Sequence, residues 1–264
     1  MLWLSMPLSV GAAEWSNFKQ PKAGAASSIG RYNSGCLQGG RALPLQGDGY
    51  QVMRVSRNRY YGHPELVRFV SRLGDRVRRE KLGVMLVGDL SMPRGGPFAS
   101  GHRSHQTGLD VDIGLRLDLP SLPVSAREDL QSLSMVKPGR YAIDPAHWSL
   151  GQARLIELAA EDPSVARIFV NAVIKRELCR STRGDRNWLR NVRPWFGHRA
   201  HLHVRLRCPE QSRGCVSQLE PPPGDGCGAE LASWFPDPNR KPQKSKPPKP
   251  RAPLPAQCTA MLRE

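Results

Sequence analysis

Histidine and aspartate are concentrated in two short segments of this chain. Five of the seven histidines lie there: His102 and His105 in the first segment, and His198, His201 and His203 in the second. The first segment also contains Asp112. Imidazole nitrogen and carboxylate oxygen are donors in catalytic zinc sites, which use three protein ligands and leave one position open for water. The two segments therefore predict a zinc hydrolase, whereas the isolated His63 and His147 are expected to have structural roles.

The spacing of the polar residues within each segment matches the period of a β-strand. Successive side chains of a strand point to opposite faces, so His201 and His203 share one face. Asp110 and Asp112 share a face in the same way. The intervening apolar residues then form the other face: Val111, Ile113, Leu202 and Val204. Two such strands side by side would gather imidazoles and carboxylates on one side of a sheet and hydrocarbon on the other.

The elements around these segments show both helical and strand patterns. Apolar residues at helical spacing predict helices over 64–82 and 150–160, and Asn171 can cap a short helix that ends at Cys179. A further helix is expected over 125–133. The expected strands are 84–87, 109–115, 167–170 and 201–207. We therefore expect an α+β fold: a small antiparallel sheet that carries the zinc site, with flanking helices and long disulfide-tied loops.

Cysteine usage indicates an oxidising compartment. The cysteines are even in number and lack the Cys-x-x-Cys spacing of a structural zinc site. They are Cys36, Cys179, Cys208, Cys215, Cys227 and Cys258. An even set of this kind is typical of disulfide-bonded proteins outside the cytoplasm. Six cysteines allow fifteen pairings, so spacing alone leaves their connectivity open.

Composition divides the chain into three parts. Residues 1–13 are apolar, with small residues before Glu14 but no basic start, and we interpret them as a truncated signal peptide. Residues 14–235 form the expected catalytic domain. Residues 236–264 form a Pro/Lys-rich tail, which Cys258 would tie back to the body. No stretch reaches the ~18 apolar residues of a membrane-spanning helix.

The spacing of the candidate ligands resembles a known signature. His105-x-x-Gly108-x-x-x-Asp112, followed far downstream by His201-x-His203, is similar to that of the lysostaphin/D-Ala-D-Ala-peptidase superfamily of zinc peptidases. Within this superfamily, the chain resembles the penicillin-insensitive murein endopeptidases over several ordered blocks. These blocks are 28–30, 50–54, 61–64, 104–113, 167–171, 192–196 and 198–208. The resemblance extends from about residue 15 to residue 258 and includes all six cysteines.

The resemblance implies a set of metal ligands. Zinc would be held by Asp112, by His203 and by one ring nitrogen of His105. His102 matches a further histidine of the family and would be a fourth ligand or line the cleft. It lies three residues before His105, which would place it on the opposite face of a strand, so a bend near Ser104 is required.

The resemblance also implies a reaction and its location. The chain would be a periplasmic endopeptidase that hydrolyses the D-alanyl-meso-diaminopimelyl cross-link between peptidoglycan stem peptides. His201 would act as general base or stabilise the developing oxyanion, and His198 would orient the substrate or a neighbouring ligand. The implied disulfides are Cys36–Cys258, Cys179–Cys227 and Cys208–Cys215.

One zinc ion per chain is expected. Some relatives carry an Asp-x-x-His pair for a second metal just upstream of the residue that matches Trp148. The corresponding segment here, residues 135–143, contains neither ligand. Asp144 and His147 have the right spacing but come several residues too late, so we do not expect a second zinc.

The chain is strongly basic. Lys and Arg number 39 against 23 Asp and Glu, which gives a net charge of +16. This charge favours an anionic partner, for which nucleic acid is the usual first candidate. The basic residues are scattered, however, and no DNA- or RNA-binding motif accompanies them. Peptidoglycan stem peptides also carry free carboxylates, and we expect them, rather than nucleic acid, to be the partner. No oligomeric state is predicted.

Two alternative functions share parts of this pattern. A D-alanyl-D-alanine carboxypeptidase would use the same ligands with a different substrate pocket, and a non-enzymatic murein-binding module would lose a ligand. A serine mechanism has little support, because no Gly-x-Ser-x-Gly motif is present. Ser-x-x-Lys occurs at Ser16 and Ser134 without the Ser-Asp-Asn or Lys-Thr-Gly partners of penicillin-binding enzymes. Insensitivity to penicillin would follow, since no nucleophile is available for acylation.

Overall fold

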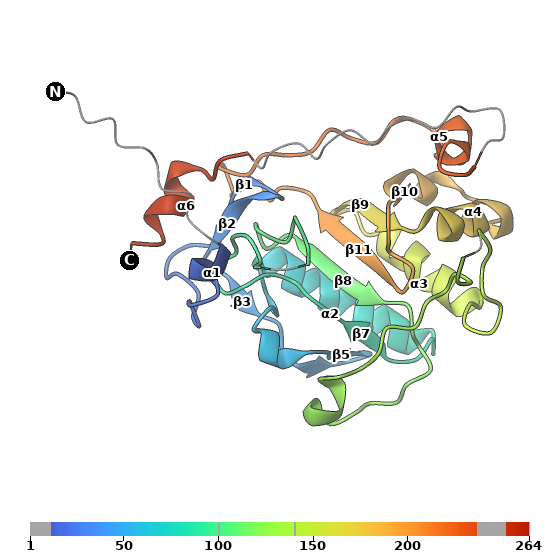
Figure 1. The fold of residues 1–264 in the computed structure, drawn as a ribbon, viewed down its shortest axis with the longest axis horizontal. Coiled ribbons are helices and arrows are strands. Elements are labelled where there is room, and N and C mark those ends of the chain that lie inside the picture. The colour runs from blue at the N-terminus through green and yellow to red at the C-terminus, as the bar shows by residue number, and fades with distance from the viewer. Residues whose placement is uncertain (1–11, 100, 140, 237–251, 264) are drawn as a thin grey trace.

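The computed structural model describes residues 12–99, 101–139, 141–236 and 252–263, and its centre is a seven-stranded sheet (Figure 1). In spatial order the strands are β10 (Val192–Pro194), β9 (Val165–Val170), β11 (His201–Leu206), β8 (Asp110–Gly114), β7 (Met85–Val87), β5 (Tyr50–Val52) and β4 (Gln46–Gly47). The four expected strands are β7, β8, β9 and β11, with slightly different bounds.

The sheet is antiparallel at its centre and has one parallel pair on each side. β11 pairs antiparallel with β8 and β9, and β8 pairs antiparallel with β7. The pairs β9–β10 and β5–β7 are parallel. Parallel neighbours need a crossover connection, which α4 (Ala172–Ser181) and α2 (Pro64–Arg79) provide. The α+β class and the antiparallel centre are confirmed, whereas the parallel flanks extend the sheet beyond what local periodicity indicated.

The long helices bury the apolar side of the sheet. The ring of His63 caps α2 by accepting a hydrogen bond from the backbone N–H of Glu65 (3.2 Å), and α3 (Leu150–Ala160) begins with a capping box between Ser149 and Gln152. In Figure 1, α2 lies behind β8. One buried apolar cluster includes Leu66, Phe69, Leu155 and Ile156 from the helices and Val111, Ile113, Leu202 and Val204 from the strands. The expected hydrocarbon layer beneath the polar strand face is therefore present.

A smaller apolar cluster lies beside a β-hairpin that forms a second, separate sheet. The hairpin consists of β1 (Ser27–Arg31) and β2 (Ser34–Gln38), with α1 (Ala12–Trp15) and α6 (Ala256–Ala260) near it in Figure 1. The buried side chains of this smaller cluster are Trp15, Ile29, Cys36, Met92, Phe98, Cys258 and Met261. A short pair, β3 (Arg41–Ala42) with β6 (Tyr61–Gly62), forms a third sheet. The hairpin and the segment that follows β7 are thus packed as one unit.

The prediction of a helix over residues 125–133 is wrong. The structure has a single 3-10 turn, Val124–Arg127, followed by irregular chain. The buried Arg127 guanidinium donates to the carbonyl oxygens of Leu45 (2.7 Å) and Val52 (3.2 Å), and these long-range bonds hold the segment in place of helical ones. The remaining short helices are Val55–Arg57, Asn187–Asn191 and α5 (Ala229–Ala232).

Three disulfides connect distant parts of the fold. They are Cys36–Cys258, Cys179–Cys227 and Cys208–Cys215, which confirms the pairing that the resemblance implies. Their presence indicates an oxidising compartment. In the part of the chain that the structure describes, no helix is both long and apolar enough to cross a bilayer. The expected signal peptide falls mainly in residues 1–11 and much of the expected tail in residues 237–251, which lie outside the described residues.

Candidate metal centre

The polar face of the two central strands carries half of the candidate site. In the antiparallel register of β8 and β11, His203 lies opposite Asp112, and Arg205 lies opposite Asp110. His201 is paired with Gly114, one step further along the same face. The alternation inferred from a period of two residues therefore describes these strands correctly, and it places imidazoles and carboxylates side by side.

The first pair of histidines does not lie on a strand, contrary to the strand-like interpretation of that segment. His102 and His105 belong to the irregular loop between β7 and β8. The backbone of His105 is left-handed (φ 68°), its N–H donates to Asp110 Oδ2 (2.9 Å), and its ring Nδ1 lies 2.7 Å from the carbonyl oxygen of Leu90. The ring also stacks on Phe98, with 5.7 Å between centroids. This loop supplies the change of direction that the spacing of the two histidines requires.

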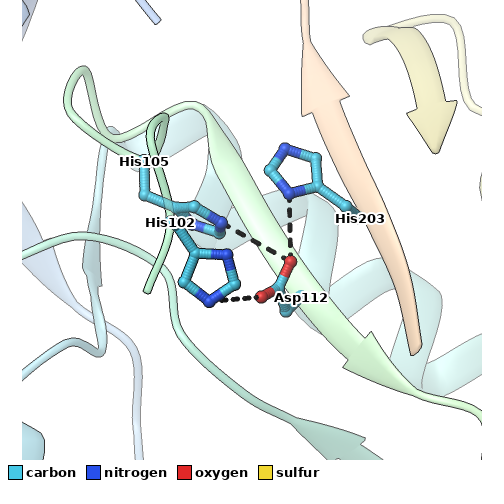
Figure 2. Close-up of side chains that lie close together, drawn as sticks. All are labelled: His102, His105, Asp112 and His203. Carbon is cyan, nitrogen blue, oxygen red and sulfur yellow. Dashed lines mark ion pairs between the residues drawn. The ribbon is translucent and has the colours of Figure 1, made fainter. Parts of the chain in front are cut away.

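Four side chains converge on one point, as Figure 2 shows. They are His102, His105, Asp112 and His203, whose donor atoms all lie within 4.8 Å of one another. The Asp112 carboxylate is central: Oδ1 lies 3.0 Å from His203 Nδ1 and 3.5 Å from His105 Nε2. Its Oδ2 lies 3.2 Å from His102 Nε2. The two clusters of the sequence therefore meet in a single site.

This donor set fits a metal ion. His105 Nε2 and Asp112 Oδ1 are buried, and neither has hydrogen-bond geometry with any group among the described residues. Buried polar atoms are normally hydrogen-bonded, so these two indicate a binding site for a further group. Ligand atoms about 2.0–2.1 Å from a tetrahedral zinc ion lie about 3.4 Å from one another. The donor atoms of this cluster lie within 4.8 Å of one another, so the four side chains could hold one metal ion.

A fifth residue, the acidic Asp110, supports the cluster. Its fully buried carboxylate lies 3.1 Å from His203 Nε2 and accepts a hydrogen bond from Arg205 Nε (2.7 Å). Burial opposes ionisation, but Arg205 and His203 hold the pKa of Asp110 well below its usual range. The contact at Nε2 leaves His203 Nδ1 facing Asp112, which is how a neighbouring carboxylate orients a histidine ligand. Although its strand face was evident, this role of Asp110 was not identified from the sequence.

Asp89 is a second residue that the sequence did not single out. It lies two residues after the end of β7, and its Oδ2 lies 3.6 Å from His102 Nε2. Arg59 (2.9 Å) and Arg57 (3.4 Å) contact the same oxygen. The acid at the end of a predicted strand was a weak local signal, and only the folded chain brings it beside a histidine 13 positions later in the sequence.

His201 and His198 lie beside the cluster rather than within it. His201 Nε2 is 3.8 Å from Asp112 Oδ1, and the His201 and His198 ring centroids are 4.9 Å apart. Burial lowers the pKa of His201 below its ordinary value. Burial also lowers the pKa of His198 to about 4, although its contact with the carbonyl oxygen of Phe196 acts in the opposite direction. Both imidazoles are therefore neutral at neutral pH and able to accept a proton.

All six predicted site residues are thus brought together, and the two isolated histidines are not among them. His63 caps α2. His147 contacts the carbonyl oxygen of Ser134 (3.0 Å) and the carboxylate of Asp144 (3.6 Å). The Asp144/His147 pair is therefore separate from the four-residue cluster.

The cluster is open on two sides. A hollow of about 650 Å³ is lined by His102, His198 and His203, and a smaller one of about 140 Å³ is lined by Asp112 and His201. His102 borders both hollows. An extended ligand could therefore pass across the cluster from one hollow to the other.

Comparison with known proteins gives a consistent result. The model of a family described as penicillin-insensitive murein endopeptidase matches residues 28–263. A penicillin-insensitive murein endopeptidase of Salmonella paratyphi C (strain RKS4594) is 49% identical over 267 residues, covering 100% of this chain and 96% of the relative. That of Klebsiella pneumoniae (strain 342) is 51% identical over 259 residues, covering 97% of this chain and 93% of the relative.

Proposed function

This chain belongs to the penicillin-insensitive murein endopeptidase family, and we propose that it is a periplasmic zinc peptidase. Its substrate is peptidoglycan, and the bond cleaved is the D-alanyl-meso-diaminopimelyl cross-link between two stem peptides. The observation that carries the proposal is the convergence of three imidazoles and one carboxylate on a single point. Three disulfides support a location in an oxidising compartment of the cell envelope.

We assign the metal to the convergent cluster. His105, through Nε2, and His203, through Nδ1, are the nitrogen ligands, because their other ring nitrogens face the carbonyl oxygen of Leu90 and the carboxylate of Asp110. Asp112 supplies the oxygen ligand. His102, whose side chain is 29% exposed, is the fourth donor on the solvent side. When bound, zinc would activate water as a nucleophile and polarise the scissile carbonyl. A catalytic zinc can expand its coordination, so a fourth protein donor is compatible with this chemistry.

The two neighbouring histidines supply proton transfer and orientation. His201 is neutral at neutral pH because of burial, and its Nε2 has no hydrogen-bond partner among the described residues. A neutral imidazole in this position can take a proton from the attacking water and return it to the leaving amine. His198 is held by its contact with the carbonyl oxygen of Phe196 (2.6 Å) and faces the larger hollow, where it orients the substrate.

Mass spectrometry of purified muropeptides tests the reaction. Cross-linked dimers with a terminal D-alanyl-D-alanine pentapeptide are incubated with the protein before and after metal removal by a chelator. We expect two monomers, loss of activity with the chelator and recovery with Zn²⁺. Release of D-alanine from intact dimers would instead identify a carboxypeptidase. Dimers that remain unchanged with the zinc-loaded protein would favour the murein-binding module.

A further inference from the structure

The larger hollow beside the metal centre is positively charged. Sixteen residues line it, and none of them is Asp or Glu. The basic residues among them are Arg31, Arg103, Arg167 and Arg205. Since His102 and His203 also line the hollow, it opens directly onto the metal centre. A cavity with this lining favours the anionic part of a substrate close to the reacting bond.

The four arginines differ in how their charge is balanced. Arg205 is paired with the buried Asp110, and Arg31 and Arg103 are exposed at the rim. Arg167 is half-buried, and its Nη2 donates to the carbonyl oxygen of Leu219 (2.8 Å). It forms no ion pair with any carboxylate in the described parts of the chain. Burial, followed by repulsion from Arg205 and Arg193, lowers the pKa of Arg167. Glu220 and Glu230 act on Arg167 in the opposite direction, but neither pairs directly with its guanidinium among the described residues.

The sheet places Arg167 at a defined position relative to the metal ligands. β9 pairs with β11 so that Arg167 lies opposite Arg205, and Phe169 lies opposite His203. Residues two apart along a strand share a face and are separated by about 7 Å. The Phe169 ring lies between the two groups, 5.5 Å from the His203 ring and 6.0 Å from the Arg167 guanidinium carbon. Arg167 thus reaches the same hollow one step along the sheet from the metal centre.

We propose that Arg167 recognises the free carboxylate next to the scissile nitrogen, on the diaminopimelyl residue whose amine is released. This inference rests on the proposed function. In the D-alanyl-meso-diaminopimelyl cross-link, the carbon that carries the scissile nitrogen also carries a carboxylate. That anion must therefore lie next to the metal centre whenever the scissile carbonyl does. Arg167 is a specificity-determining residue: it selects acceptor peptides with a charged carboxylate over those in which the carboxylate is amidated.

The test compares two cross-linked dimers that differ only in amidation of this carboxylate. For the wild-type protein, kcat/KM should be roughly tenfold to hundredfold higher with the free-acid dimer than with the amidated dimer. This is the range expected for one hydrogen-bonded charge. R167Q should lower kcat/KM for the free-acid dimer to the level of the amidated dimer, so that discrimination disappears. R167K, which keeps the charge, should restore part of it. R213Q is the matched control, because Arg213 is exposed and lines a different hollow.

The outcomes separate this inference from the proposed function. Equal cleavage of both dimers by the wild-type protein would overturn the role of Arg167. An R167Q protein that loses activity on both dimers by the same factor would also overturn it, because a merely structural residue would behave in this way. The metal content and melting temperature of R167Q show whether this variant is misfolded. If it is, the discrimination of R167K between the two dimers decides whether Arg167 has the proposed role. If the zinc-loaded wild-type protein cleaves neither dimer, the proposed function itself is wrong.

Discussion

The donors of the metal centre come from two regions that are built differently. Asp112 and His203 lie opposite each other on paired strands, where the backbone hydrogen-bond ladder sets both their face and their spacing. His102 and His105 come from an irregular loop that is held by contacts to groups elsewhere in the chain, such as the carbonyl oxygen of Leu90. The strand half is thus positioned by the pairing of two strands, and the loop half by contacts of its backbone and side chains. Substitutions in the two halves should therefore have different consequences.

Removing a strand donor should have the largest effect. We expect His203→Ala to lose both the bound metal and hydrolysis of cross-linked dimers, because a nitrogen ligand disappears and two carboxylates lose their shared partner. His102→Ala, at the solvent side of the loop, should retain more metal than His203→Ala. Metal analysis per chain and mass spectrometry of the products measure both effects, with His147→Ala as the control. A His203→Ala protein with one metal ion and full activity would disprove the assigned centre.

A strand residue beside the cluster should separate catalysis from metal binding. His201→Ala should lower kcat by roughly 10²–10⁴-fold, the usual contribution of a general base, while metal content stays normal. The reason is that His201 Nε2 lies 3.8 Å from Asp112 Oδ1 but is not one of the four convergent donors. Loss of the metal from this variant would make His201 a ligand and enlarge the strand half of the site.

The carboxylate beneath the strand half should matter less than a ligand does. Asp110→Asn keeps the side-chain shape but removes the charge that faces His203 and Arg205. We expect metal affinity to fall about 10–100-fold, as is typical when the partner of a histidine ligand is replaced. A competition titration with a chelator measures this change. Asp118→Asn is the control, since that exposed residue pairs only with Arg116 among the described residues. Unchanged affinity in Asp110→Asn would mean that the strand ladder alone orients His203.

Loosening the support of the loop half should have the smallest effect on the metal. The buried Gln106 donates to the carbonyl oxygens of Asn33 and Arg103 (2.9 Å each) and accepts from the N–H of Gly35 (3.2 Å). Gln106→Ala leaves these groups unpaired, which should cost roughly 1–3 kcal/mol of stability. Metal affinity should fall only a few-fold, because the ligands themselves remain.

Thermal unfolding measures the stability of the Gln106→Ala variant, and the same chelator titration measures its metal affinity. Gln211→Ala, at an exposed position, is the control. If Gln106→Ala lost the metal as completely as His203→Ala, the loop half would be as dependent on its support as the strand half is on its ladder. The difference between the two regions would then disappear.

The predictable parts of the fold are those with local periodicity. The α3 helix occupies the expected residues, 150–160, and the strands around the site follow from alternating side chains. The 125–133 segment was predicted wrongly because its conformation depends on the buried Arg127 and its bonds to Leu45 and Val52. The parallel flanks were missed for a similar reason, since their pairing is decided by crossover helices rather than by the strands themselves.

The site divides in the same way. Residue types and spacing indicated the two segments that meet in the convergent cluster, whereas family resemblance supplied both the choice of ligands and the disulfide pairing. The sequence did not reveal that Asp89 approaches His102 or that Asp110 orients His203. Both contacts join residues from different elements, and their formation depends on register and loop path. Arg167 belongs to one of the blocks that resemble the family, but its position beside the centre follows only from the pairing of β9 with β11.

The Cys36–Cys258 bridge has a consequence for the timing of maturation. It joins residues 222 positions apart, and Cys258 is the last of the six cysteines to follow when a chain is exported from its N-terminus. The hairpin that contains Cys36 braces the segment after His105, because Ser28 Oγ donates to the carbonyl oxygen of Thr107 (2.8 Å). In the proposed periplasmic enzyme, this brace would be covalently fastened only after the whole catalytic sheet has left a reducing environment. The final locking of the hairpin would then wait until the protein has reached the compartment that holds its proposed substrate.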